Sequence, residues 1–164
     1  MENFLNSYAF EQMTKEYNKK YNINQSVEVL NKKEDERLML KVQNAFDKVF
    51  HLFYLLQIRF GNEPRFNTFF CGVEELKKDI KDFYISIYNK QYTESNIKNN
   101  NININHKMCA NKLLEVYICF FEINSCVLKD MFFNKIRQDN AFFEGFSYIF
   151  SKFTKVIKNF YTEI

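Results

Sequence analysis

Hydrophobic residues recur along most of the chain at intervals of three or four, the spacing that places side chains on one face of an α-helix. The clearest case lies near the C-terminus, where Asp139, Phe142, Phe146, Phe150 and Phe153 follow one another at such steps. Four phenylalanine rings on one helix face are unfavourable in water. We therefore expect other helices of the chain, or a partner, to cover this stripe.

The same spacing predicts five helices. They are expected over residues 4–20, from 27 to about 60, from just after Gly72 to beyond Ile87, from 108 to 132, and from 139 to 160. Ser26 and Asp139 are the predicted N-caps of the second and fifth helices, because their side-chain oxygens can accept hydrogen bonds from the first backbone N–H groups.

Two of these helices show a clear inward face. In the third helix it consists of Val73, Leu76, Ile80, Phe83 and Ile87, and in the fourth of Leu113, Val116, Tyr117, Phe120, Ile123, Val127 and Met131. The other face of the third helix is charged, at Glu74, Glu75, Lys77, Lys78, Lys81 and Asp82. The charge run that includes Glu34, Asp35 and Glu36 in the second helix has the same character. We expect both charged faces to be solvated.

Breaks between the helices are marked by residues that disfavour helix. Gly61 and Pro64 form the clearest boundary, since the chain contains only 3 Gly and 1 Pro. Residues 65–71 then read as a short aromatic connector. Residues 92–106 are rich in Asn, and we expect them to form a flexible loop that leaves the core unchanged.

Composition supports an all-α fold. The chain has 164 residues, 46% of them hydrophobic, with 20 Phe and no Trp, so phenylalanine must supply much of the packing. So few Gly and Pro residues argue against a β fold, which needs frequent turns. We predict one helical domain over residues 1–164, built as an elongated bundle or array of about five helices.

Charge and cysteine content limit the kinds of partner and the cellular compartment that we expect. The net charge is +3 and both signs are mixed along the chain, which argues against nucleic-acid binding. The most apolar run, residues 49–56, is too short to span a membrane. Cys71, Cys109, Cys119 and Cys126 form no C-x-x-C pair and no signal peptide precedes them. We expect buried, reduced thiols in a cytoplasmic or nuclear protein.

No catalytic constellation is apparent. His51 and His106 have no ligand spacing to the cysteines, and the chain has no glycine-rich phosphate loop. The sequence therefore predicts a protein that is not an enzyme, with no catalytic residue, cofactor, metal or small-molecule substrate. Its partners are expected to be proteins, although no residue can be assigned to an interface. One alternative places the Phe stripe itself on a partner helix or a membrane surface.

Several local patterns, in order, resemble the N-terminal stalk of the cullin family, a rod of five-helix repeats. The patterns are SVEVLNKKEDERL at 26–38, FYLL at 53–56, VEELKK at 73–78, KM followed by LLEV at 107–116, FFN at 132–134, D-x-x-F at 139–142 and F-x-x-F at 150–153. The match is best over residues 107–154. The chain departs from the family in lacking most of two helices between Leu40 and Val49, and in an apparent insertion at 61–72.

The resemblance implies a non-catalytic scaffold linked to cullin–RING ubiquitin ligase assembly and ubiquitin-dependent protein degradation. In cullins the adaptor and the RING-box subunit bind regions outside the stalk repeats that this chain resembles, so we expect neither to bind here. The helices at 108–132, 139–160 and after Gly72 should then pack together and superpose on a cullin repeat. The alternative is a lineage-specific helical protein–protein interaction module unrelated to cullins.

Overall fold

The structure, a computed structural model, describes residues 9, 11–13, 27–94, 104–133 and 140–164. Four α-helices make up most of these residues: α2 (Val27–Phe60), α3 (Asn67–Tyr88), α4 (His106–Phe133) and α5 (Asn140–Glu163). A short 3-10 helix, η1 (Pro64–Phe66), separates α2 from α3. No strand occurs in the described ranges, and the predicted all-α fold is confirmed.

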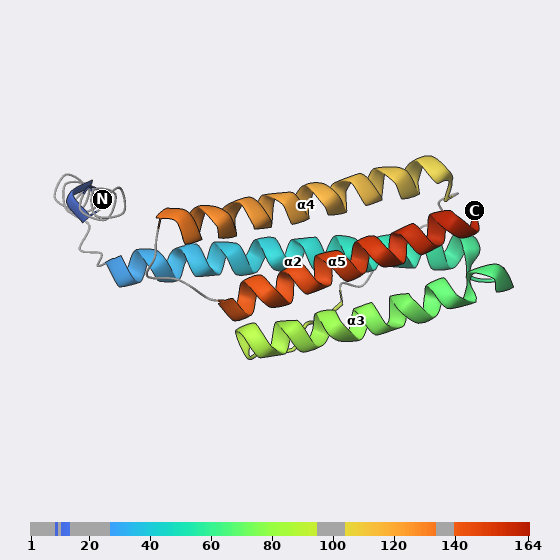
Figure 1. Cartoon of the computed structure of the whole chain (residues 1–164), viewed down its shortest axis with the longest axis horizontal. Coiled ribbons are helices and arrows are strands. Elements are labelled where there is room, and N and C mark those ends of the chain that lie inside the picture. The colour runs from blue at the N-terminus through green and yellow to red at the C-terminus, as the bar shows by residue number, and fades with distance from the viewer. Residues whose placement is uncertain (1–8, 10, 14–26, 95–103, 134–139) are drawn as a thin grey trace.

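The four helices lie side by side in an elongated bundle (Figure 1). The longest, α2, has 34 residues and is therefore about 50 Å long. The helix α4 packs along α2, and α5 packs along α3. Both α3 and α4 run opposite to α2, whereas α5 runs parallel to it, so α3 ends and α4 begins at opposite ends of the bundle (Figure 1).

The predicted break after α2 is confirmed. The helix ends at Phe60, and the Gly61 N–H donates to the Gln57 carbonyl oxygen at 2.8 Å. A Cβ atom on Gly61 would lie 2.3 Å from that same oxygen, so only glycine fits this tight turn. Pro64 then opens η1, a first-turn position where its missing N–H is not needed.

The aromatic connector predicted at residues 65–71 is wrong, because α3 already begins at Asn67. Phe66 and Phe69 are buried and extend the stripe of Val73 and Leu76 by almost two turns. Gly72, predicted to precede the helix, lies inside it, where a Cβ atom would be 3.4 Å from the Val156 side chain. That distance is an ordinary van der Waals contact, so neither a helix boundary nor a lack of space requires glycine at this point.

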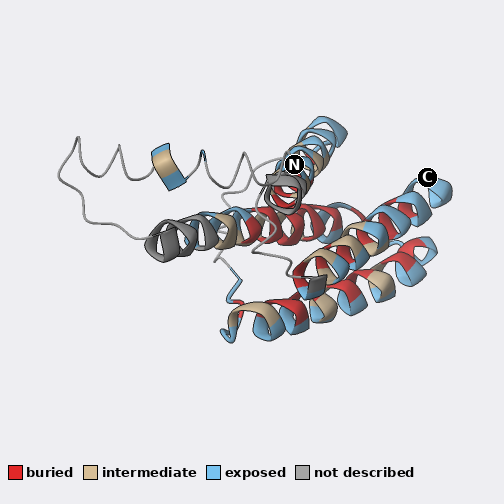
Figure 2. Cartoon of the chain, turned by 60° about the vertical axis from the view of Figure 1, so that its left-hand side comes forward, coloured by how far each residue is buried: buried red, intermediate tan, exposed pale blue. Residues whose placement is uncertain are grey.

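The phenylalanine stripe of α5 forms the centre of the core. Phe142, Phe146 and Phe153 are 5%, 1% and 0% exposed, and Phe150 is half-buried. As expected, residues of α3 and α4 cover it, including Phe83, 6.3 Å from Phe146 between ring centroids, and Phe120. The second helix, which the sequence does not assign to this cover, also contributes to it: Phe46 lies 6.4 Å from Phe146 and Phe53 lies 6.0 Å from Phe153, between ring centroids. The buried faces of the helices turn toward one another (Figure 2).

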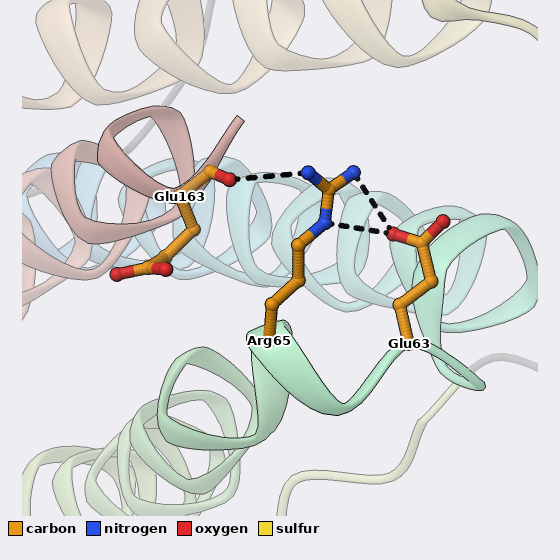
Figure 3. A network of polar contacts seen from close by, with 3 residues as sticks. All are labelled: Glu63, Arg65 and Glu163. Atoms are coloured by element: carbon orange, nitrogen blue, oxygen red, sulfur yellow. Dashed lines mark hydrogen bonds and ion pairs between the residues drawn. The ribbon is translucent and has the colours of Figure 1, made fainter.

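Arg65 joins η1 to the end of α5 (Figure 3). Its guanidinium Nη1 donates to the Glu163 carbonyl oxygen at 3.4 Å, and Nε donates to the Glu63 carboxylate at 3.1 Å. The same guanidinium lies 4.7 Å from the centroid of the Phe66 ring. These polar contacts are exposed and contribute little; the one to Glu163 links η1 to the last turn of α5, and those to Glu63 and Phe66 orient the guanidinium.

The Asn-rich loop does affect the core at the two ends that the structure describes. Tyr92 is 7% exposed and its ring lies 5.2 Å from Phe50 and 5.6 Å from Tyr84, between centroids. Its hydroxyl donates a hydrogen bond to the Asp47 carboxylate of α2. Ile104 is also buried. Tyr92 is thus part of the core, and the expectation of a loop that leaves the core unchanged is wrong there.

Replacing Tyr92 with Phe should lower the free energy of unfolding by about 1–2 kcal/mol at neutral pH, because Asp47 loses a hydrogen-bond donor while the ring stays in place. Burial, then the hydrogen bond to Asp47, raises the pKa of Tyr92 above its usual 10.0. The folded state therefore holds this proton more tightly than the unfolded state, and the stabilisation is complete below pH 10 and lost as the pH rises beyond it.

The measurement is urea denaturation between pH 7 and pH 11. The free energy of unfolding should fall more steeply above pH 10 in the wild type than in Tyr92→Phe. Because both proteins contain the same lysines, the titration of these lysines cancels when the two pH profiles are subtracted. Tyr148→Phe, at a tyrosine that is 57% exposed, is the control and should leave the stability at pH 7 unchanged. Parallel pH profiles for the wild type and Tyr92→Phe would contradict this account.

The remaining predictions concern the first helix, the helix starts and the inward face of α4, and some of their residues lie outside the described ranges. Of the first predicted helix, residues 9 and 11–13 are described and are helical. The N-caps Ser26 and Asp139 lie outside the described ranges. The fourth and fifth helices begin at His106 and Asn140, within two residues of their predicted starts. Of the predicted inward residues of α4, Val116, Phe120, Ile123 and Val127 are buried.

Candidate interaction surface

The phenylalanine stripe of α5 is not the surface of this protein. Phe142 and Phe146 are at most 5% exposed, so the alternative that placed this stripe on a partner helix or a membrane surface finds no exposed face there. In addition, each helix in the described ranges is too short or too polar to cross a bilayer. A surface for partners has to be sought elsewhere.

The outer face of α4 carries the apolar side chains that the core leaves uncovered. Leu114, Ile118 and Phe121 are 60%, 48% and 59% exposed. Their spacing of four and three residues places them within about 60° of one another around the helix axis and extends about 10 Å along it. We call these three residues the α4 outer stripe.

The α4 outer stripe lies opposite the core face of the same helix. At 100° per residue, the stripe is centred about half a turn away from Val116, Phe120 and Ile123, which are all 0% exposed. An α-helix at a protein surface normally has one apolar face and one polar face, and a helix that is apolar on both faces is usually buried on both. By this criterion the sequence of α4 is that of a helix buried on both faces, yet its outer face is exposed.

The stripe is connected to the core through one ring. Phe150 of α5, half-buried, lies 6.0 Å from Phe121 and 5.2 Å from Phe120 between ring centroids. Tyr117 approaches the same Phe150 ring edge-on at 6.1 Å. The apolar surface therefore continues from the core, over the edge of α5, to the outside of α4, on rigid helices rather than on loops.

The cysteines are all free thiols in different environments. Cys109 and Cys119 are buried, as predicted. Cys126 is half-buried and its sulfur accepts a hydrogen bond from the Lys41 ammonium at 3.4 Å. Cys71 is exposed, and its predicted burial is wrong, because it lies on the outer side of α3, a helix that begins earlier than expected.

The titratable groups between α2 and α4 form an ion pair beside a neutral histidine. Lys112 donates to the Glu115 carboxylate at 2.9 Å, and this hydrogen bond is the main cause that lowers the pKa of Glu115. Burial, followed by the charge of Lys112, lowers the pKa of His51. The imidazole is therefore uncharged at pH 7. Lys112 and Glu115 form an ion pair between neighbouring turns of α4, a common arrangement on helix surfaces, and we assign no function to this cluster.

The structure also places the remaining sequence candidates. His106 is exposed at the first turn of α4, with its ring 5.9 Å from that of Phe60, far along the bundle from His51. In the described ranges, no three His, Cys, Asp or Glu residues lie together as a metal site would require. Glu36 is exposed, in keeping with a solvated charge run, and the structure does not describe the side chains of Glu34 and Asp35.

Sequence reasoning overlooked the α4 outer stripe, although the signal was present. The residues at 114, 118 and 121 have helical spacing of their own, but the inward set of α4 was already complete without them. Comparison with protein-family models, with curated proteins and with solved structures finds no match for this chain.

Proposed function

We propose that this chain is a non-catalytic protein-binding scaffold that docks an apolar helix of a partner protein on the α4 outer stripe. The observation that carries the proposal is that α4 is apolar on two opposite faces while only one of them is covered. A helix with two apolar faces fits the interior of a helical array. The missing neighbour is therefore a helix with an apolar stripe of its own.

The chemistry of the surface favours a helix over other occupants. The exposed residues around Leu114, Ile118 and Phe121 on α4 include the uncharged Asn111 and Ser125 and two isolated charges of opposite sign, Lys107 and Glu122. A nucleic acid or an anionic lipid surface would require clustered cations here. An amphipathic helix laid along α4 would instead meet apolar side chains at steps of three and four residues, the pattern of helix-in-groove recognition.

The narrower form of the proposal is a stalk segment of a divergent or truncated cullin, acting in ubiquitin-ligase assembly in the cytoplasm or nucleus. It rests on the order of sequence patches, of which KM at 107–108 falls in the first turn of α4 and F-x-x-F at 150–153 in the core face of α5. Cullin repeats stack helix upon helix, which would give the outer face of α4 a neighbour. An interaction module unrelated to cullins would use the same stripe.

The experiment places a photo-crosslinking amino acid at Ile118 and identifies the crosslinked peptide by mass spectrometry. The double variant Leu114→Glu/Phe121→Glu should reduce the crosslinked product at least about tenfold, because two charges would be buried in an apolar interface. The matched control is Leu40→Glu/Ile58→Glu on α2, at residues 61% and 42% exposed, and it should leave the product unchanged. Circular dichroism verifies that both variants stay folded.

Each outcome has a definite meaning. A crosslink into an amphipathic helix of another protein, lost only in the α4 variant, supports docking on the stripe. If that protein is a component of a ubiquitin ligase, other than the adaptor or RING-box subunit, the cullin form is supported. Any other helical protein supports the unrelated module. A crosslink to a second copy of this chain, or one equally strong in both variants, or none, overturns the proposal.

A further inference from the structure

An apolar pocket of about 200 Å³ lies at the end of the bundle where α2 ends, α4 begins and α5 ends. Its floor is formed by Leu52 and Leu56 of α2 and by Ile157 and Phe160 of α5, none of them more than 4% exposed. Ala110 of α4, which is exposed, lies at its mouth. The pocket is separate from the α4 outer stripe, whose three residues are absent from its lining.

Two features of the chain explain why this space is not filled. The Phe160 ring borders the pocket but packs against η1 and α3, where it lies 5.0 Å from Phe66 and 4.9 Å from Phe69 between centroids, and so does not fill it. On the other side, α4 contributes the small side chains of Cys109 and Ala110. The buried packing of Phe160 holds the end of α5 in this position, and one exposed hydrogen bond from Arg65 to Glu163 adds to it (Figure 3), so the pocket is part of the folded bundle.

The lining is largely apolar, with His106 and Tyr161 as its polar side chains. It contains no Asp, Glu, Lys or Arg, and several of its side chains are aromatic rings. Burial raises the pKa of the Cys109 thiol and the charge of Arg59 opposes this only in part, so the sulfur is neutral at pH 7. The pocket is open to solvent on the side of its exposed residues Ala110, Tyr161 and Ile164, and water inside it finds few hydrogen-bond partners on the apolar walls. A ligand that fills it gains apolar contacts without displacing well-bound water.

We propose that this pocket binds a small, uncharged aromatic molecule. An engineered apolar cavity of about 150 Å³ holds benzene, so a volume of about 200 Å³ suits a planar molecule of roughly eight to ten heavy atoms. Rings such as Phe60 and Phe160 can pack against its face or edge. Sequence analysis predicts no small-molecule substrate, and the ligand inferred here is bound without being converted.

Indole is the probe. The chain has no Trp, so the fluorescence of added indole can be followed with excitation at wavelengths longer than those that its 10 Tyr absorb. On binding, its emission should shift to shorter wavelength as the ring leaves water. At a free concentration ten times the dissociation constant, indole should raise the folding equilibrium constant about 11-fold and the Tm by roughly 3–6 °C.

Two neighbouring variants locate the site. Ala110→Phe places a ring over the mouth and should abolish both the emission shift and the rise in Tm. Asn111→Phe adds the same ring one residue along, at an exposed position outside the lining, and should change neither. Both substitutions are at exposed positions, so the fold is not at risk. Indole that fails to bind the wild type, or that binds Ala110→Phe as well as the wild type, overturns the proposal.

Discussion

Phe120→Ala should lower the free energy of unfolding by about 3–5 kcal/mol, the cost of removing a large, fully buried ring and leaving a cavity. Phe120 is 0% exposed and its ring lies 5.4, 5.2 and 5.5 Å from those of Phe146, Phe150 and Phe153, between centroids. These three rings stand on α5, whereas the backbone of α4 packs along α2. Because α4 is held by α2, it cannot simply move in to close the cavity.

The adjacent residue provides the control. Phe121 is 59% exposed, and Phe121→Ala should change the free energy of unfolding by less than about 1 kcal/mol. Urea denaturation with an unchanged m-value measures both. If Phe120→Ala does not fold, Phe120→Leu should still lose about 1–2 kcal/mol, since part of the volume is retained. If Phe120→Ala and Phe121→Ala lowered the free energy of unfolding equally, α4 would have to present a different face to the core from the one described here.

Alanine at the two helical glycines should have effects of opposite sign. A Cβ atom on Gly145 would lie 2.7 Å from the Phe83 ring, well inside van der Waals contact. Phe83 is 7% exposed and packs against Phe46 and Phe142, so it has little room to move. We expect overpacking to outweigh the gain in helix propensity of about 1 kcal/mol, with a net loss of about 1–2 kcal/mol.

Gly72→Ala, by contrast, should stabilise the protein by about 0.5–1 kcal/mol. The new methyl group would be 3.4 Å from the Val156 side chain, an ordinary contact, and the helix would gain the propensity difference. Thermal unfolding of the two variants under the same conditions gives the comparison. A rise in Tm for both would show that α3 and α5 can separate at Gly145 without cost.

The helices and most of their inward faces could be predicted from the sequence. The boundary at Gly61 and the burial of Val116, Phe146 and Phe153 followed from spacing and from two turn residues alone. The errors arose where local cues misled. The glycine pattern predicts a helix boundary at Gly72, which lies within α3, and the polar neighbours of Tyr92 predict a loop that leaves the core unchanged. In both cases a contact distant in sequence, of Phe69 with Phe160 or of Tyr92 with Asp47, decides the outcome.

The candidate sites depended on structure to a greater degree. Leu114, Ile118 and Phe121 could be recognised as an apolar set in the sequence, but not as an uncovered one, because covering depends on which helices are neighbours. The pocket at the end of the bundle was beyond reach for the same reason, since its walls come from three helices.

The sequence by itself determined that the chain forms long amphipathic helices with phenylalanine-rich faces, because helical periodicity is a local property. Only the tertiary structure decided that α4 pairs with α2 and α5 with α3, leaving one apolar face of α4 exposed. The physical reason is that rings such as Phe46, Phe120 and Phe153 are chemically interchangeable as packing partners. Their pairing is fixed by the combined geometry of four helices, which no single stretch of sequence contains.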